Sequence, residues 1–151
     1  MSSNQKVVEK SLKYYQSGYN CAESVLLALY EHLEPKGKNE LIPKIAAGFG
    51  GGIGRCGSVC GALTGSIMAV GIKYADNDSA VQKRAQAYVN AKTLLKQFEK
   101  QQGTTFCRDL IKYDLSNSEE LEKFRKEGLP QKVCSKVIAA AIENFLALER
   151  K

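Results

Sequence analysis

Residues 48–61 read GFGGGIGRCGSVCG, and seven of these fourteen residues are glycine. Glycine weakens helices and strands, but it permits backbone angles and close approaches that other residues cannot adopt. The sequence therefore predicts a loop in the middle of the chain, built for unusual backbone angles or for close approach of another group. The loop leads into the apolar segment 59–72, VCGALTGSIMAVGI. We interpret that segment as a buried helix from Val59 to Tyr74, capped by Ser58.

Helical periodicity dominates on both sides of the loop. Further helices are expected over residues 6–16, 20–33, 39–47, 80–102, 105–113 and 118–127, and from residue 130 onward. Asn20 and Glu23 form a capping-box pattern, Ala75–Ser79 separates two helices and caps the second, and Gly103 and Gly128 end helices. In the long helix one apolar stripe is predicted: Val81, Ala85, Tyr88, Ala91, Leu95 and Phe98. No segment alternates as a strand, so residues 1–151 are expected to form an all-α, single-domain helical bundle with a central glycine-rich loop.

Composition excludes several classes of protein. The net charge is +6, but no run of five basic residues occurs and tryptophan is absent, so no nucleic-acid partner is expected. The longest apolar run is too short to cross a bilayer, so no membrane insertion is expected. The polar start, MSSNQKVVEK, does not resemble a signal peptide, and a cytoplasmic location is expected.

The chain has five cysteines, at positions 21, 56, 60, 107 and 134. Their spacing matches no Cys-x-x-Cys, haem-attachment or ferredoxin pattern. Four of them lie in the first or second turn of a predicted helix, with Asn20, Ser58, Thr105 and Pro130 as the start signals: Cys21, Cys60, Cys107 and Cys134. Helix N-termini stabilise negative charge, so these thiols are expected to have a lowered pKa. Thiolates suit disulfide exchange and metal ligation.

A non-functional interpretation stands beside this one. Free cysteine is often buried as a small hydrophobic residue. Cys134, for example, continues the apolar stripe of the last helix, with Ile138, Ala141, Phe145 and Leu148. On this interpretation the protein is a helical adaptor with inert thiols.

The segment Cys60–Gly65, CGALTG, reads CGAxxG, with one cysteine well upstream and two well downstream. This order resembles the C_GCAxxG_C_C family, small bacterial and archaeal proteins described as redox-active, although Cys60 here precedes the glycine that the family name writes first. The resemblance implies that Cys21, Cys60, Cys107 and Cys134 are the catalytic or metal-binding residues, and that Cys56 is dispensable. An iron–sulfur cluster or zinc is the candidate cofactor, and a redox partner of unspecified identity is implied.

Other residues near the cysteines have two interpretations each. Gly61 and Gly65 are candidate cofactor-binding residues, because small residues let a cofactor or Cys60 approach closely. With Ala69 they also form a series of small residues suited to helix packing, within the bundle or across a homodimer. Arg55 and Arg108 could lower a thiol pKa or meet an anionic ligand. His32, the single histidine, is interpreted as a surface or packing residue.

Three functional hypotheses follow. The leading one is a redox protein in which the four cysteines converge at helix N-termini to hold a metal or iron–sulfur centre, or to cycle between thiol and disulfide. The second is a non-catalytic zinc-binding module. The third is the helical adaptor. The sequence leaves open whether the protein is an enzyme.

Overall fold

The computed structural model describes residues 1–75 and 80–151, and within the long helix it describes all side chains except those of residues 80 and 83. The all-α prediction is confirmed, and the described residues contain no strand beyond one isolated bridge, Val59 with Phe106. The elements are α1 (Ser3–Gln16), α2 (Cys21–Leu33), the 3₁₀ helix η1 (Lys44–Phe49), α3 (Gly61–Tyr74), α4 (Ala80–Gln102), α5 (Cys107–Ile111), α6 (Ser118–Lys126), the π-helical turn η2 (Pro130–Cys134) and α7 (Ser135–Leu148). The predicted helix start within residues 76–79 lies outside the described residues. No described helix has the length and apolar character needed to span a bilayer.

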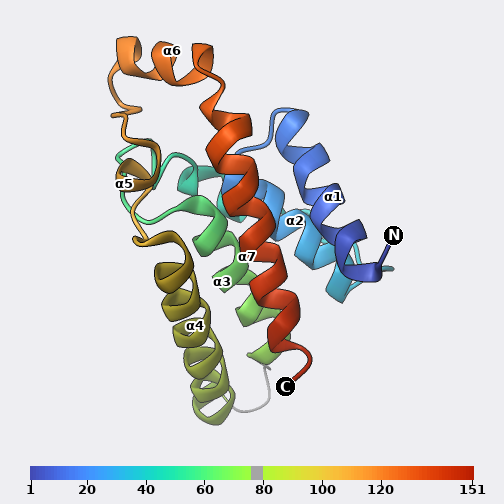
Figure 1. The fold of residues 1–151 in the computed structure, drawn as a ribbon. Coiled ribbons are helices and arrows are strands. Elements are labelled where there is room, and N and C mark those ends of the chain that lie inside the picture. Colours follow the sequence, from blue (N-terminus) through green and yellow to red (C-terminus); the bar gives the residue numbers. More distant parts are fainter. Residues whose placement is uncertain (76–79) are drawn as a thin grey trace.

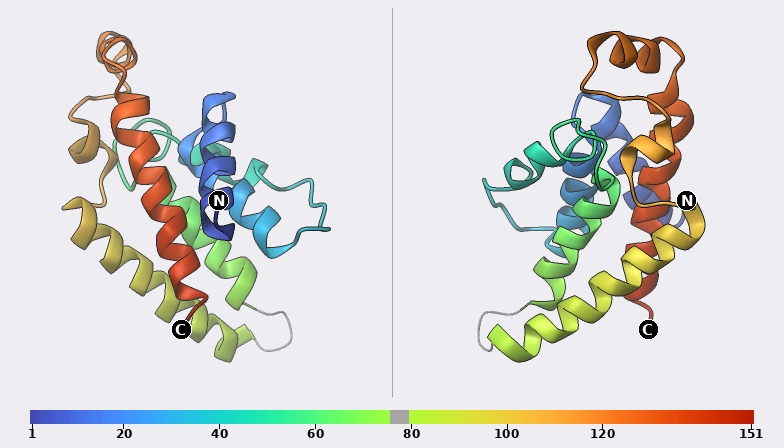
Figure 2. Two further views of the ribbon diagram at one scale, coloured as in Figure 1. Left: turned by 45° about the vertical axis from the view of Figure 1, so that its right-hand side comes forward. Right: turned by 90° about the vertical axis from the view of Figure 1, so that its left-hand side faces the viewer.

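Helix α7 runs through the bundle, and α1, α2, α3 and α4 all pack against it (Figure 1). Helices α2 and α3 also pack closely on each other. The centre of the core is formed by fully buried side chains from α2, α3, α4 and α7: Leu26, Leu29, Leu63, Leu94, Ile138, Ile142, Phe98 and Phe145. Helix α6 crosses the end of the bundle, close to the start of α7 (Figure 2).

The predicted cap at Asn20 is confirmed. Its side chain accepts a hydrogen bond from the Glu23 N–H at 2.9 Å, and the Glu23 carboxylate accepts one from the Asn20 N–H at 2.9 Å. The caps predicted at Ser58 and Thr105 are wrong, because α3 begins at Gly61 and α5 at Cys107. The residues before both helices pair with each other in the isolated bridge, which holds them extended.

The helix predicted over residues 39–47 is also wrong. Only the 3₁₀ helix Lys44–Phe49 forms there, opened by a hydrogen bond from the Ala46 N–H to the Pro43 carbonyl at 2.8 Å. Proline disfavours the helical conformation in the residue before it, which keeps residues 39–42 out of a helix.

The apolar stripe predicted for α4 holds only in its C-terminal part. Phe98 is buried, but Val81 and Tyr88 are 71% and 67% exposed. The face that packs on the bundle instead carries Leu94 and Phe98, one turn apart. The N-terminal half of α4 lies at the end of the bundle opposite α6 (Figure 2), and most of its described side chains are exposed.

The glycine-rich loop contains a left-handed turn. Five consecutive residues, Gly51 to Arg55, have φ values between 57° and 70°. This conformation costs an L-amino acid roughly 1–2 kcal/mol per residue, and glycine avoids that cost at three of the five positions. The loop is thereby coiled against the end of the bundle instead of extending into solvent.

Close packing of α3 on α2 predicts a difference between two glycines of α3. A Cβ at position 65 would lie 2.6 Å from the Ala22 carbonyl oxygen, whereas a Cβ at position 71 would meet no atom within 4 Å. Gly65→Ala should lower the free energy of unfolding by about 1–3 kcal/mol, because the helices must separate. Gly71→Ala should raise it by up to about 1 kcal/mol through helix propensity. Chemical denaturation of both variants measures this, and equal effects would contradict the packing.

Candidate functional site

Four cysteines from four separate segments line one cavity of about 100 Å³: Cys21, Cys60, Cys107 and Cys134. Cys21 is the first residue of α2, Cys60 immediately precedes α3, Cys107 is the first residue of α5, and Cys134 immediately precedes α7. The structure therefore brings together, at helix starts, the four residues singled out in the sequence. Their roles in ligation or catalysis remain predictions.

The isolated bridge places two of these cysteines. The Cys60 N–H donates to the Thr105 carbonyl at 2.8 Å, and the Cys107 N–H donates to the Ser58 carbonyl at 2.7 Å. Cys60 and Cys107 each follow a bridge residue, Val59 or Phe106. Side chains alternate along extended backbone, so both thiols leave the bridge on the same side, opposite to Val59 and Phe106.

Glycines allow the remaining close approaches. A Cβ at Gly61 would lie 2.4 Å from the Cys21 sulfur, and a Cβ at Gly52 would lie 2.7 Å from the Cys107 Cβ. Gly61 and Gly65 both lie against α2, where Gly65 faces the backbone of Ala22, in agreement with the helix-packing interpretation. Their role in binding a cofactor stays a prediction. These glycines shape the cavity by letting α3 approach α2.

Cys134 is placed by the π-helical turn at the start of the last helix. Ser135 closes this turn, donating its N–H and its side-chain hydroxyl to the Pro130 carbonyl. Tyr15, from α1, lines the same cavity, and its hydroxyl lowers the pKa of the Cys134 thiol, although burial outweighs this effect. No sequence signal distinguished Tyr15 from its neighbours.

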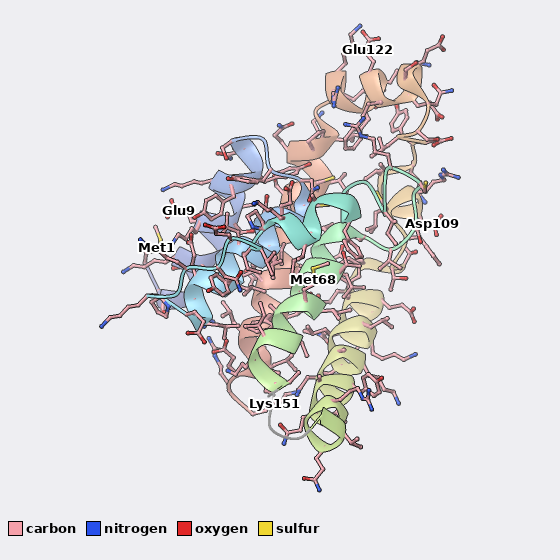
Figure 3. All side chains as sticks on the ribbon, turned by 180° about the vertical axis from the view of Figure 1, so that it is seen from behind. Met1, Glu9, Met68, Asp109, Glu122 and Lys151 are labelled. Atoms are coloured by element: carbon pink, nitrogen blue, oxygen red, sulfur yellow. The ribbon has the colours of Figure 1, made fainter. Side chains whose placement is uncertain are left out.

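Three residues considered in the sequence lie elsewhere. Cys56 is exposed in the loop and does not line the cavity. His32 contacts Glu149 at 3.1 Å, in agreement with a packing role. Arg108 hydrogen-bonds the Cys56 carbonyl at 3.3 Å and pairs with Asp114 at 3.1 Å, on the side of the molecule where Figure 3 labels Asp109.

The expectation of lowered thiol pKa values is wrong. Burial raises the pKa of Cys107 to about 12 and that of Cys134 to about 11, with the neighbouring thiols adding to the rise. Burial also raises the pKa of Cys21, and it raises that of Cys60 well above its usual value. Backbone N–H groups of Gly51 and Gly61 oppose the effect at Cys21, as helix starts should, but desolvation is the larger contribution.

Apolar side chains complete the cavity wall. They come from α5, from the segment after it, from α6 and from the start of the last helix: Leu110, Ile111, Leu115, Phe124, Val133 and Val137. Cys107, Ile111, Leu115 and Phe124 form a small core of their own, separate from the main one. The wall of this cavity thus offers few groups that could form hydrogen bonds with water.

No group of three or more His, Cys, Asp or Glu side chains within residues 1–75 and 80–151 is arranged to hold a single metal ion. A cavity of about 100 Å³ is several times the roughly 10–15 Å³ that one water needs. The cavity therefore has room for a group larger than one water molecule.

A family model described as "Putative redox-active protein (C_GCAxxG_C_C)" matches residues 19–148 of the chain. An uncharacterised protein of Archaeoglobus fulgidus is 30% identical to it, over 97% of this chain and 95% of that protein. No solved structure matches the chain significantly.

Burial predicts which thiols react in the metal-free, reduced protein. At pH 8, iodoacetamide should alkylate Cys56 well before the four cavity cysteines, because the reagent needs an accessible thiolate. The rates at Cys107 and Cys134 should keep rising about tenfold per pH unit up to pH 10, since both pKa values lie above that range. Peptide mass spectrometry gives each rate. Alkylation of all five cysteines at similar rates at pH 8 would contradict a buried site.

Proposed function

The chain belongs to the C_GCAxxG_C_C family, and we propose that it is a redox protein whose reactive centre is the four-cysteine cavity. One observation carries this proposal: four thiols from distant segments line the same small, apolar space. Cysteines that served only as core residues would have no reason to converge. The helical adaptor with inert thiols is therefore the less supported hypothesis.

An iron–sulfur cluster is the centre that fits this cavity best. Four cysteines are the usual ligand set of such clusters, and each iron of a cubane cluster takes one cysteine sulfur. The thiolates of such a cluster lie further apart than the ligands of one ion. Four cysteines from separate segments around one cavity agree with that requirement. When bound, the cluster would supply one-electron transfer.

The chain's own residues would tune such a centre. Backbone N–H groups of Gly51 and Gly61 lower the pKa of Cys21, and those of Ala62 and Leu63 lower that of Cys60, so these groups favour negative charge on the two sulfurs. Hydrogen bonds to ligand sulfur stabilise negative charge and raise a cluster's potential. The Tyr15 hydroxyl, which lowers the pKa of Cys134, would also favour negative charge on that sulfur. Ligation by thiolate also explains how four thiols with raised pKa values could be deprotonated, because metal binding releases their protons.

Thiol–disulfide cycling is the second candidate. The observation that favours it is the set of four free thiols that line one cavity. Two thiols would give one disulfide, two protons and two electrons, and the electrons would pass to a redox partner. The raised pKa values oppose this candidate at neutral pH, because the thiolate is the attacking species. A zinc module is less supported. Zinc requires four sulfurs about 2.3 Å from a common centre, and no group in the described part of the chain is arranged in that way.

Iron and sulfide binding tests the proposal. Protein reconstituted without air should bind iron and acid-labile sulfide and become brown. Cys60→Ser should lose most of the iron, because it removes a sulfur from the cavity. Cys56→Ser is the matched control and should keep the wild-type content, since Cys56 does not line the cavity.

Two results would count against the cluster. Iron content that falls equally in both variants would place the centre in the loop. An iron-free wild type that shows one reversible disulfide within the chain would favour thiol–disulfide cycling. Circular dichroism of each variant shows whether a loss of iron reflects a loss of fold.

A further inference from the structure

A second cavity, of about 450 Å³, opens beside the four-cysteine cavity, and we call it the outer cavity. Five residues line both spaces: Tyr15, Asn20, Gly51, Leu115 and Phe124. The rest of the outer wall comes from the glycine-rich loop on one side and from α6 and Pro130 on the other. Figure 3 shows α6, with Glu122 labelled, at the end of the bundle beyond this loop. A molecule in the outer cavity would therefore lie next to the thiols.

The outer cavity carries unbalanced positive charge. Arg55 from the loop and Arg125 from α6 both line it, and none of its lining residues is an Asp or Glu. Among the ion pairs of the described residues, neither arginine takes part. Arg108, the other arginine near the loop, differs because it is paired with Asp114. Two arginines from separate segments can contact one anionic group from two directions.

The backbone at Arg55 is also unusual. Its φ is 65°, within the left-handed turn where glycine occupies three of the five positions and Ile53 the remaining one. Glycine would also be the easiest residue to accommodate at position 55. The Cα and Cγ of Arg55 lie over Gly51, because a Cβ added at position 51 would be 2.8 Å from each of these two atoms. Residues held in sparsely populated backbone conformations of this kind cluster at ligand sites and active sites.

Apolar side chains make up most of the outer-cavity wall on the side of α6. Leu115, Leu121, Phe124 and Pro130 line this side together with Arg125, whereas Arg55 comes from the loop. The volume falls in the range of small-molecule sites. A ligand that matches both the arginines and the apolar side chains has an anionic group and an apolar body.

We propose that the outer cavity binds a small organic anion, a carboxylate or phosphate attached to an apolar group, through Arg55 and Arg125. Its role as the substrate or electron acceptor of the cysteine centre rests on the proposed function, but the binding itself does not. The anion is held by the arginines, and its apolar part lies against Leu115 and Phe124, which also line the four-cysteine cavity.

Calorimetric titration of the reduced full chain at low ionic strength tests the binding. The probes are phenyl phosphate and 3-phenylpropionate, which separate a phosphate ligand from a carboxylate ligand. Inorganic phosphate and phenol, each carrying half of the required chemistry, should bind at least about tenfold more weakly than the better probe. Failure of both whole probes to bind, or binding of inorganic phosphate as tight as that of phenyl phosphate, would overturn the proposal.

Matched variants locate the site. Arg55→Gly and Arg125→Gln should each weaken binding of the better probe about tenfold or more, since each removes a charged hydrogen bond. Arg55→Gly should leave the fold at least as stable, because glycine adopts a positive φ freely. Lys126→Gln removes the same charge from the adjacent position of α6, outside the cavity, and should change binding less than about twofold.

An equal loss in Lys126→Gln would overturn the proposal, because it would show attraction by net charge alone. Iron and thiol content of these variants should match the wild type. Failure of the anion site is thereby distinguishable from failure of the cysteine centre.

Discussion

A single pair of backbone contacts organises the site. The isolated bridge between Val59 and Phe106 joins the end of the glycine-rich loop to the segment before α5. It sets Cys60 and Cys107 on one side of the paired backbone, although 46 residues separate them in sequence. The left-handed turn, Gly51 to Arg55, folds the loop back toward this bridge, so that Gly52 lies against Cys107. Cys21 and Cys134 then reach the same cavity from the starts of the neighbouring helices.

Two opposing electrostatic effects meet at these thiols. Helix starts and loop N–H groups favour the thiolate, whereas burial among apolar side chains favours the neutral thiol. Burial is the larger effect at all four positions. Four buried thiols with raised pKa values are poor nucleophiles near neutral pH. In the proposed metal centre, the same N–H groups would stabilise the charge on the sulfurs once the metal had displaced the protons. This contrast supports the proposal of ligation over that of free thiolate chemistry.

Much of the fold could be predicted from local sequence. The capping pair of Asn20 and Glu23, the stop at Gly128 and the stripe of the last helix depend on neighbours within one or two turns. The caps at Ser58 and Thr105 failed because a long-range bridge, invisible to local pattern, outcompetes the helix at both places. In α4 the periodicity was correct, but the facing partner was unknown, so Val81 and Tyr88 were placed in the core. Likewise, Tyr15 carried no signal, because its place in the cavity wall beside Cys134 depends on the tertiary fold. The cysteine set itself was identified by family resemblance, and the structure adds its convergence.

The claim that the four cysteines form one centre is tested most directly by the coordination shell of its metal. Extended X-ray absorption fine structure at the iron edge, on protein reconstituted without air, reports the elements bound to iron. The account predicts a first shell of sulfur alone, with a neighbouring iron beyond it, in the wild type and in Cys56→Ser. A first shell containing nitrogen or oxygen would contradict it, because the iron would then be held by groups other than the four cysteines.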